Sequence, residues 1–407
     1  MAVLLLQGPL GPFNKHLTNA LKAQGVTVYS IQFNGGDALF SSPYGAVQYT
    51  GTLKNWPNFF TKFVRSNRIK TVLAYGDCRA YHREAKRICL LEDDVRYFAF
   101  EEGYLRPNYI TLEEGGVNGY SPIKRSLVEP YAPVHSPREE VEMGGNMLRR
   151  ACYAMSYDAI ATLSKIWFRH YQHHRPLTPI RTGLAWVRAY LRKQLYKFTQ
   201  PDAATLVRRA PFFLVPLQVH NDAQIEFHSE FDGMEAFIEH VMSSFAASGC
   251  DAHLVFKHHP MDRGFTHYGA LIKRLARGYN IESKVQYIHD QHLPTLLKHS
   301  KGVVTVNSTT ALQAFYHRAP VKALGDAFFD MEGLTYQGKL DTFWLEPSGL
   351  DDDFSDQFKA YLLEHGQING SFYCHSEFTV QNVIEYLCRV NALPLKINPQ
   401  GDGVCLQ

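Results

Sequence analysis

Short apolar runs alternate with longer segments of helical periodicity along the first part of the chain. The runs fall at residues 3–6, 27–34, 71–76 and 95–107, and an amphipathic segment after the first run ends at Gly25. Apolar runs of this length, separated by amphipathic helices, are typical of parallel strands that are buried on both faces of a sheet. The pattern therefore predicts a parallel α/β domain.

The same alternation returns in the second half of the chain. Five further runs are predicted as strands, at residues 212–219, 252–260, 285–290, 302–308 and 319–325. Because 407 residues exceed a comfortable single core, we expect two doubly wound domains that face a central cleft, with ligands at the carboxyl ends of the strands. The expected boundaries are 1–145 for an N-terminal Rossmann-like domain on the acceptor side, 146–205 for a basic helical insertion, 206–345 for a C-terminal Rossmann-like domain that binds the donor, and 346–407 for a helical tail.

The insertion differs in composition from both halves. Residues 146–200 contain ten Lys or Arg residues and one acidic residue, Asp158, with aromatic side chains interleaved between the basic ones. One interpretation is a helical connector with a solvated basic face, and the other is an amphipathic surface that rests on anionic lipid. The residues considered for acceptor or membrane contact are Arg149, Arg150, Arg169, Arg175 and Arg181.

The overall composition narrows the class of protein. A formal charge of +3 gives no argument for nucleic acid binding, and seven scattered cysteines without a CxxC pair indicate reduced thiols rather than a disulfide framework or a zinc site. The first apolar run has no basic flank, and no stretch approaches the length of a membrane span. We therefore expect a soluble, cytoplasmic protein.

Two adjacent carboxylates stand at the end of the aromatic run at 95–107. Glu101 and Glu102 precede Gly103, and because side chains alternate along an extended chain, only one of them readily faces a given cleft. Partial burial against aromatic rings would raise the pKa of that carboxyl toward the range of a general acid or base. The alternative is a solvated pair in a turn.

The loop after the run at 212–219 carries Gln218, His220 and Asp222 close together. An isolated Asp between a strand and a helix is usually the N-cap of that helix. The alternative is a reactive carboxylate at the carboxyl end of a strand, where folds of this class bind their ligands.

Three polar residues, Lys257, His258 and His259, end the run at 252–260 and are closed by Pro260. Such a set is poor material for a core and suits the binding of an anion or the donation of a proton. Metal binding is less favoured, because no HxH or HxxxH spacing joins these histidines to a carboxylate.

A cluster of small polar residues, Asn307, Ser308 and Thr309, stands at the end of the run at 302–308 and precedes a helix. The hydroxyls there can cap the helix or, together with its free N–H groups, bind a phosphate. No Walker A or GxGxxG pattern is present, so neither a P-loop enzyme nor a classical dehydrogenase is expected.

Five segments in a fixed order resemble the motifs of one protein family. They are "FEEGYLRPNYITLE", "QVHNDAQI", "KHHPMDRG", "HLPTLL" and "VNSTTALQAF", and they are similar to segments of the capsule polysaccharide β-Kdo transferases and, more distantly, of bacterial sialyltransferases. The resemblance covers most of residues 1–345 and implies a GT-B-like fold with two Rossmann-like domains. The length fits members that have one module rather than two in tandem.

The resemblance implies a donor site for CMP-Kdo. His259 would hold the phosphate of the donor, and Ser308 and Thr309 would bind the same phosphate at the helix N-terminus. No metal or other cofactor is implied, because these groups would neutralise the phosphate. The other residues expected around the donor are Lys257, His258, Asn307 and Gln218.

The resemblance also implies a retaining reaction, which requires either two inversions or a front-face attack. In the double displacement, Asp222 would attack the anomeric carbon and Glu102 would act as acid/base toward the acceptor hydroxyl. Glu101 is the alternative acid/base. Glu102 is favoured because the middle position of the related sialyltransferase motif is usually the catalytic one.

The family is known to build the Kdo linker between a capsular polysaccharide and a lyso-phosphatidylglycerol anchor. This implies four kinds of partner: a CMP-sugar donor, a phospholipid-linked acceptor, the cytoplasmic face of the inner membrane, and other capsule biosynthesis or export proteins. Two alternatives stay open. One is a GT-B transferase that uses a UDP-hexose, and the other is a non-catalytic partner in capsule assembly or export.

Overall fold

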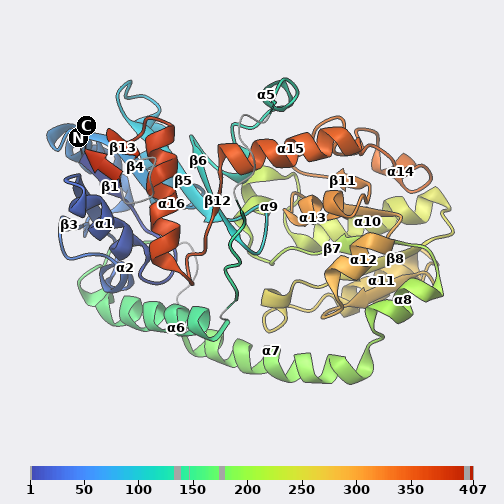
Figure 1. Ribbon diagram of the computed structural model, residues 1–407. Helices are drawn as coiled ribbons and strands as arrows, with labels where there is room; N and C mark the ends of the chain where they lie inside the picture. Colours follow the sequence, from blue (N-terminus) through green and yellow to red (C-terminus); the bar gives the residue numbers. More distant parts are fainter. Residues whose placement is uncertain (1, 133–138, 146, 174–178, 398–403, 407) are drawn as a thin grey trace. The chain divides into compact units, whose positions relative to one another are not determined.

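The computed structural model describes residues 2–132, 139–145, 147–173, 179–397 and 404–406 (Figure 1). The chain divides into two compact units, each with its own sheet. Unit 1 consists of Met1–Pro122, Val134–Pro179 and Leu362–Gln407, and unit 2 consists of Ile123–Pro133 and Ile180–Tyr361. Both units are α/β, as the alternation of apolar runs predicts, and together they supply the two Rossmann-like units of a GT-B-like fold.

Unit 1 is built on a seven-stranded sheet in the order β12-β6-β5-β4-β1-β2-β3. The central strands pair in parallel, whereas β6 is antiparallel to β5 and β12 is antiparallel to β6. The strands of unit 1, including a separate antiparallel pair of β13 with β14, are β1 (Ala2–Leu5), β2 (Thr27–Gln32), β3 (Ala46–Gln48), β4 (Ile69–Tyr75), β5 (Arg96–Glu102), β6 (Tyr109–Glu114), β12 (Gln367–Asn369), β13 (Leu395–Ile397) and β14 (Val404–Leu406).

Helices cover both faces of the unit 1 sheet. Phe13 of α1 and Val383 of α16 lie in one core with Phe98 of β5, and Phe60 of α3 lies in the opposite core with Tyr97 of β5. Adjacent residues of β5 therefore face opposite sides of the sheet, as expected of an extended strand. The helices of unit 1 are α1 (Phe13–Ala23), α2 (Gly35–Phe40), α3 (Trp56–Ser66), α4 (Ala80–Cys89), α6 (Met147–Leu163) and α16 (Ser376–Arg389), with short 3-10 helices η1 (Leu53–Asn55), η2 (Asn118–Tyr120) and η3 (Ser164–Ile166).

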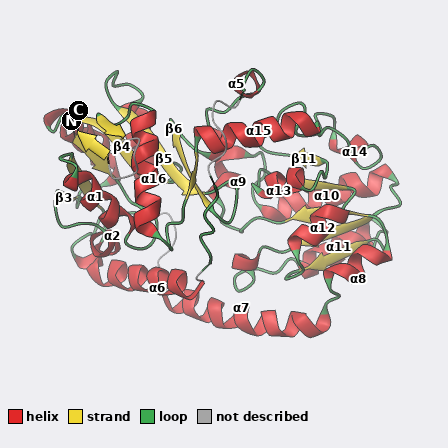
Figure 2. Ribbon diagram, viewed as in Figure 1, coloured by secondary structure: helices red, strands yellow, loops and turns green. Residues whose placement is uncertain are grey.

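Unit 2 contains a five-stranded sheet in the order β11-β10-β7-β8-β9, and all its strands are parallel (Figure 2). The central strand β7 is fully buried along its length, which explains its uninterrupted apolar run. The strands are β7 (Phe212–Pro216), β8 (His253–Lys257), β9 (Val285–Ile288), β10 (Gly302–Thr305) and β11 (Val321–Ala323).

One face of the unit 2 sheet is packed by α10 and α11, through Phe237 and Ile272. Trp344 completes this core, and its indole N–H donates to the Oγ of Ser244 at 2.9 Å, which satisfies its single polar group. The helices of unit 2 are α5 (Arg125–Val128), α7 (Pro179–Thr199), α8 (Ala203–Arg209), α9 (Ala223–His228), α10 (Met234–Ser248), the 3-10 helix η4 (Pro260–Asp262), α11 (Gly269–Gly278), α12 (Leu293–His299), α13 (Thr310–Tyr316), α14 (Leu340–Phe343) and α15 (Asp352–His365), of which α15 runs across the boundary into unit 1.

The nine predicted strands are all present, each within a few residues of its expected position. The division of the chain differs from the expected one. The basic insertion is not a separate element, because α6 belongs to unit 1 and α7 to unit 2, and the expected tail is divided at Leu362 between the two units. Strands β3, β6, β12, β13 and β14 were not predicted.

Candidate active site

Three motifs that are far apart in the sequence lie at the carboxyl ends of three neighbouring strands of unit 2. Strands β10, β7 and β8 are adjacent in the sheet, and the loops that follow them carry Ser308, Asp222 and His259 respectively. Because the strands are parallel, these three loops emerge at the same edge of the sheet. This is the position where open α/β sheets bind ligands.

Asp222 is the N-cap of α9, and its side chain accepts a hydrogen bond from the backbone N–H of Gln224 at 3.0 Å. The capping interpretation is therefore confirmed. The carboxylate is partly exposed, and among the described residues no group bonds to its second oxygen. Capping thus leaves one oxygen of Asp222 available for chemistry.

Gln218 and Asn307 form a closed pair of amides that joins the β7 and β10 loops. The Gln218 Nε2 donates to Asn307 Oδ1 at 3.0 Å, and the Asn307 N–H donates to Gln218 Oε1 at 3.2 Å. The Asn307 side-chain amide also donates to the carbonyls of Gln224 and His228. Both side chains are buried, so they hold the loops together rather than present free groups to a donor, as had been expected of them.

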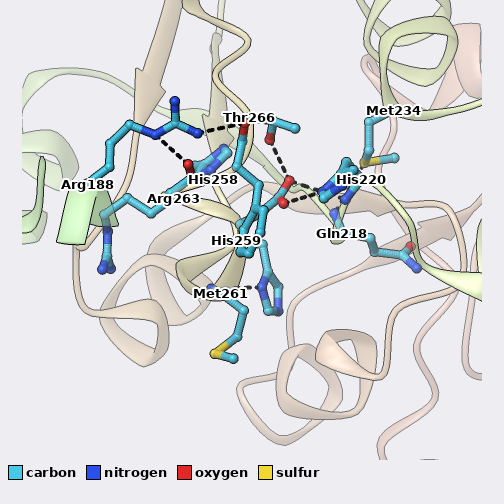
Figure 3. Close-up of polar contacts among 12 residues, drawn as sticks. Arg188, Gln218, His220, Met234, His258, His259, Met261, Arg263 and Thr266 are labelled. Carbon is cyan, nitrogen blue, oxygen red and sulfur yellow. Dashed lines mark hydrogen bonds and ion pairs between the residues drawn. The ribbon is translucent and has the colours of Figure 1, made fainter. Parts of the chain in front are cut away.

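His259 begins the turn η4, and its Nδ1 accepts a hydrogen bond from the backbone N–H of Met261 at 3.2 Å (Figure 3). This bond fixes the orientation of the ring, which is partly exposed at the end of β8. The contact of His259 with an anion stays a prediction.

Lys257 and His258 point into the protein interior. The Lys257 ammonium donates to the carbonyl of His289 at 2.9 Å, and burial lowers its pKa to about 8. The His258 Nδ1 bonds to the hydroxyl of Tyr287 at 2.7 Å, and burial lowers the pKa of this histidine to about 4. Both residues were expected near the donor. Their hydrogen bonds instead join the end of β8 to Tyr287 and His289 at the end of β9.

Ser308 caps α13 locally. Its Oγ accepts from the backbone N–H of Thr310 at 3.2 Å and donates to the Thr310 hydroxyl at 3.1 Å. Thr309 occupies the N-cap position without a capping bond from its side chain. Both residues are partly exposed. The hydroxyls therefore remain at the edge where they were predicted.

A hydrogen-bonded pair that sequence reasoning did not identify joins the β7 and β8 loops. The His220 Nδ1 lies 2.5 Å from Asp262 Oδ1, and Asp262 is completely buried (Figure 3). The sequence signal was weak, because Asp262 stands three residues beyond His259 in "HHPMDRG" and nothing links it to residue 220 except the fold.

The acidic pair lies at the carboxyl end of β5 in unit 1, and its two members differ in environment. Burial raises the pKa of Glu101 to about 7, and the charge of Glu102 adds to this, although a hydrogen bond from the Glu102 N–H at 2.9 Å opposes it. Glu102 accepts a hydrogen bond from the Tyr373 hydroxyl at 3.0 Å and pairs with Arg150 at 3.2 Å. Glu101 thus has the pKa expected of an acid/base, and Glu102 is held by a cation.

The basic residues assigned to acceptor or membrane contact have different surroundings. Arg150 pairs with Glu102 and lies over the Tyr373 ring at 4.8 Å, so it is part of the acidic site and not a free surface cation. Arg149 donates to the Tyr373 carbonyl at 3.2 Å, and Arg169 donates to the Ile166 carbonyl at 3.3 Å. Arg181 is exposed on α7, and Arg175 lies outside the described residues.

Helix α7 is fixed on one side to the loop that follows η4. Arg188 donates to the carbonyls of Gly264 and Phe265 (Figure 3). Arg192 donates to the carbonyls of Arg263 and Thr266. A Cβ atom on Gly264 would lie 2.0 Å from the carbonyl oxygen of Ala185, so only glycine permits this approach.

A stripe of exposed apolar side chains at helical spacing runs along α7. They are Leu184, Val187, Leu191, Leu195 and Phe198. The helix also has five basic residues and no acidic one. Within the described chain, no helix is both long and apolar enough to cross a membrane.

The part of the chain that the structure describes contains no group of three or more His, Cys, Asp or Glu side chains that could hold a metal ion.

The chain belongs to the family of capsule polysaccharide biosynthesis proteins, which matches residues 70–373. It is similar to the capsule polysaccharide export protein KpsS of Escherichia coli, with 40% identity over 375 residues that cover 91% of this chain and 96% of that protein. The capsule polysaccharide modification protein LipB of Neisseria meningitidis serogroup A is 37% identical over 394 residues, or 93% of each chain. The solved structure of a β Kdo 2,7 transferase, KpsC of Thermosulfurimonas dismutans, aligns over 96% of this chain and 100% of that chain, with a TM-score of 0.46 and 13% identity. The expected family is confirmed.

Proposed function

We propose that this protein is a retaining β-Kdo transferase that moves Kdo from CMP-Kdo to a (lyso)phosphatidylglycerol-type acceptor and so starts the linker of a capsular polysaccharide. The observation that carries the proposal is the convergence of the Asp222, His259 and Ser308 loops at one edge of the unit 2 sheet. A nucleophile and two anion-binding elements at one edge match the needs of a phosphate-activated sugar donor.

The proposed reaction proceeds in two displacements. The free carboxylate oxygen of Asp222 attacks the anomeric carbon, the bond to the phosphate oxygen breaks, and CMP leaves with its electron pair. The acceptor hydroxyl then attacks the glycosyl-enzyme ester, loses its proton to a general base, and releases Asp222 as a carboxylate. We assign the base to Glu101 instead of Glu102, because a pKa of about 7 suits proton transfer near neutral pH.

The donor and the acceptor can be tested with the purified full chain. We expect product from CMP-Kdo and lyso-phosphatidylglycerol, detected as an added Kdo mass on the lipid, and no product when a UDP-hexose replaces CMP-Kdo. Transfer from the UDP-sugar would favour the other GT-B interpretation. Absence of transfer from any nucleotide sugar would contradict the enzymatic proposal.

A second function is a non-catalytic role in capsule assembly or export, and the name of the Escherichia coli relative, an export protein, favours considering it. The two functions differ in what they require of Asp222. An assembly partner would tolerate Asp222→Asn, because asparagine is also a good helix N-cap. A transferase would lose activity in the same variant.

We further propose that α7 is the part of the chain that contacts an anionic lipid surface at the cytoplasmic face of the inner membrane. Its exposed apolar side chains and its basic residues have the composition of an interfacial amphipathic helix, with Trp186 and Tyr190 as aromatic members. The Phe198 side chain is 86% exposed, so an apolar surface would bury it.

Vesicle flotation tests this role. We expect wild type to float with phosphatidylcholine vesicles that contain phosphatidylglycerol, and less so as salt is added. The Lys193→Glu/Lys197→Glu variant should bind at least roughly 30-fold more weakly, because each cation contributes about 1 kcal/mol near such a surface. The matched control is Lys298→Glu, an exposed lysine on α12. Equal flotation of both variants would contradict the role of α7.

A further inference from the structure

The His220–Asp262 pair has a geometry that the proposed reaction does not yet use. Asp262 is 0% exposed and accepts three hydrogen bonds: from the His220 N–H at 3.2 Å, from the His220 ring at 2.5 Å, and from the Thr266 hydroxyl at 2.5 Å. The bond from the His220 backbone N–H already joins the β7 and β8 loops, and the Thr266 bond fixes the Asp262 carboxylate within the β8 loop. The two loops are therefore joined even without the contact between the His220 ring and Asp262.

The contact with Asp262 determines which edge of the His220 ring is presented outward. Because Nδ1–H donates to a carboxylate, Nε2 is the ring atom left for a ligand. The ring is stacked against Phe265 at 5.8 Å, and the side chain is 35% exposed. Among the described residues, no group bonds to Nε2. His220 is thus a fixed imidazole with one open nitrogen.

The position of His220 relates this nitrogen to the reacting carbon. His220 lies two residues before Asp222 in the short loop between β7 and α9, and its partner Asp262 lies in the turn that His259 begins. His220 therefore belongs to the loop that carries the proposed nucleophile, and it is hydrogen-bonded to the turn that begins at the proposed phosphate contact.

We propose that His220 binds the carboxylate of the donor sugar and orients the anomeric carbon toward Asp222. This inference rests on the proposed function. Kdo is a 2-ulosonic acid, so its carboxylate is attached directly to the anomeric carbon. With a proton on each nitrogen, as the proposed contact requires, the ring offers one N–H to the buried Asp262 carboxylate and the other to the donor, and such a charge-assisted bond selects for an acidic sugar. Neutral hexoses lack this group.

The test compares the binding of CMP-Kdo with that of free CMP, which has the phosphate but no sugar carboxylate. Titration calorimetry in the Asp222→Asn background prevents turnover. We expect His220→Gln to weaken CMP-Kdo binding roughly 10- to 100-fold, as for the loss of a hydrogen bond to a charged group, and to leave CMP binding unchanged. Asp262→Asn should also weaken the binding of CMP-Kdo, by a smaller factor than His220→Gln, and should leave the binding of CMP unchanged. The matched control is His299→Gln, an exposed histidine on α12.

The outcomes separate this inference from the function on which it rests. The Asp222→Asn protein could bind CMP-Kdo while the added His220→Gln change has no effect on that binding. This result would support CMP-Kdo as the donor and contradict the contact between His220 and the sugar carboxylate. A parallel loss for CMP and CMP-Kdo would instead place His220 on the phosphate and overturn the inference. If the protein binds neither ligand, both proposals fail. Thermal unfolding of each variant identifies any change that is only structural.

Discussion

Asp222→Asn is expected to abolish a covalent adduct that wild type forms with Kdo. When wild type is incubated with CMP-Kdo and no acceptor, the double displacement stops at the glycosyl-enzyme, and intact-protein mass spectrometry should show the mass of one Kdo residue on the chain. An amide at position 222 cannot form this ester. Loss of a nucleophile should also reduce steady-state transfer on the order of 10⁴-fold or more.

The structure indicates that Asp222→Asn removes the proposed nucleophile and retains the N-cap of α9. Asparagine caps helices about as well as aspartate, so the bond to the Gln224 N–H should persist and the stability of α9 should be retained. The matched control is Asp202→Asn, because Asp202 caps α8 in the same way, with Thr205 N–H at 2.7 Å. The control should retain both the adduct and the activity.

Two results would change the mechanism. If the lipid product forms while no adduct is seen on wild type, CMP-Kdo is still the donor, and a front-face reaction replaces the double displacement. If the Asp222→Asn variant transfers Kdo at the wild-type rate, Asp222 is only a helix cap.

Glu101→Gln is expected to lower kcat by roughly 10²- to 10⁴-fold and to remove the dependence of the rate on a group that titrates near pH 7. For wild type, the rate of acceptor transfer should rise with pH through about 7, since the base must be ionised. Glu102→Gln should have the smaller effect on kcat, because Glu102 is tied to Arg150 and Tyr373. The reverse ranking would restore Glu102 as the acid/base.

The same substitution has a stability readout that does not depend on activity. The pKa of Glu101 is raised in the folded protein, so the folded state favours the protonated form, and its relative stability falls as pH rises through about 7. Glu101→Gln should therefore unfold at a higher temperature than wild type above pH 7, and the difference should shrink below the unfolded pKa of about 4.5. A constant difference across this range would show that Glu101 is not desolvated.

The sequence was sufficient to predict nine of the strands and the loops that carry chemistry. Buried parallel strands give continuous apolar runs, and the motifs after 216, 257 and 305 are local in sequence, so both could be identified without contacts. Strand β12 could not be identified, because its three residues form a strand only by pairing with β6. The choice between Glu101 and Glu102 depends on Arg150 and Tyr373, which come from remote segments.

The inward orientation of four polar residues at the site could not be predicted from the sequence. Lys257, His258, Gln218 and Asn307 stand at strand ends, where polar residues usually meet solvent, but their partners lie in the neighbouring strands and loops of the sheet. The His220–Asp262 contact spans 42 positions of the chain and was invisible for the same reason.

The discontinuous composition of unit 1 has a consequence for biosynthesis. Strand β12 extends its sheet and α16 packs against α1, yet both come from the segment that begins at Leu362, after all of unit 2 has been synthesised. Domains generally fold as they emerge from the ribosome. Unit 2 is therefore able to complete its core first, while one apolar face of the N-terminal strands is covered only in part, by α1. A nascent chain that stalls before residue 362 would expose that face to chaperones.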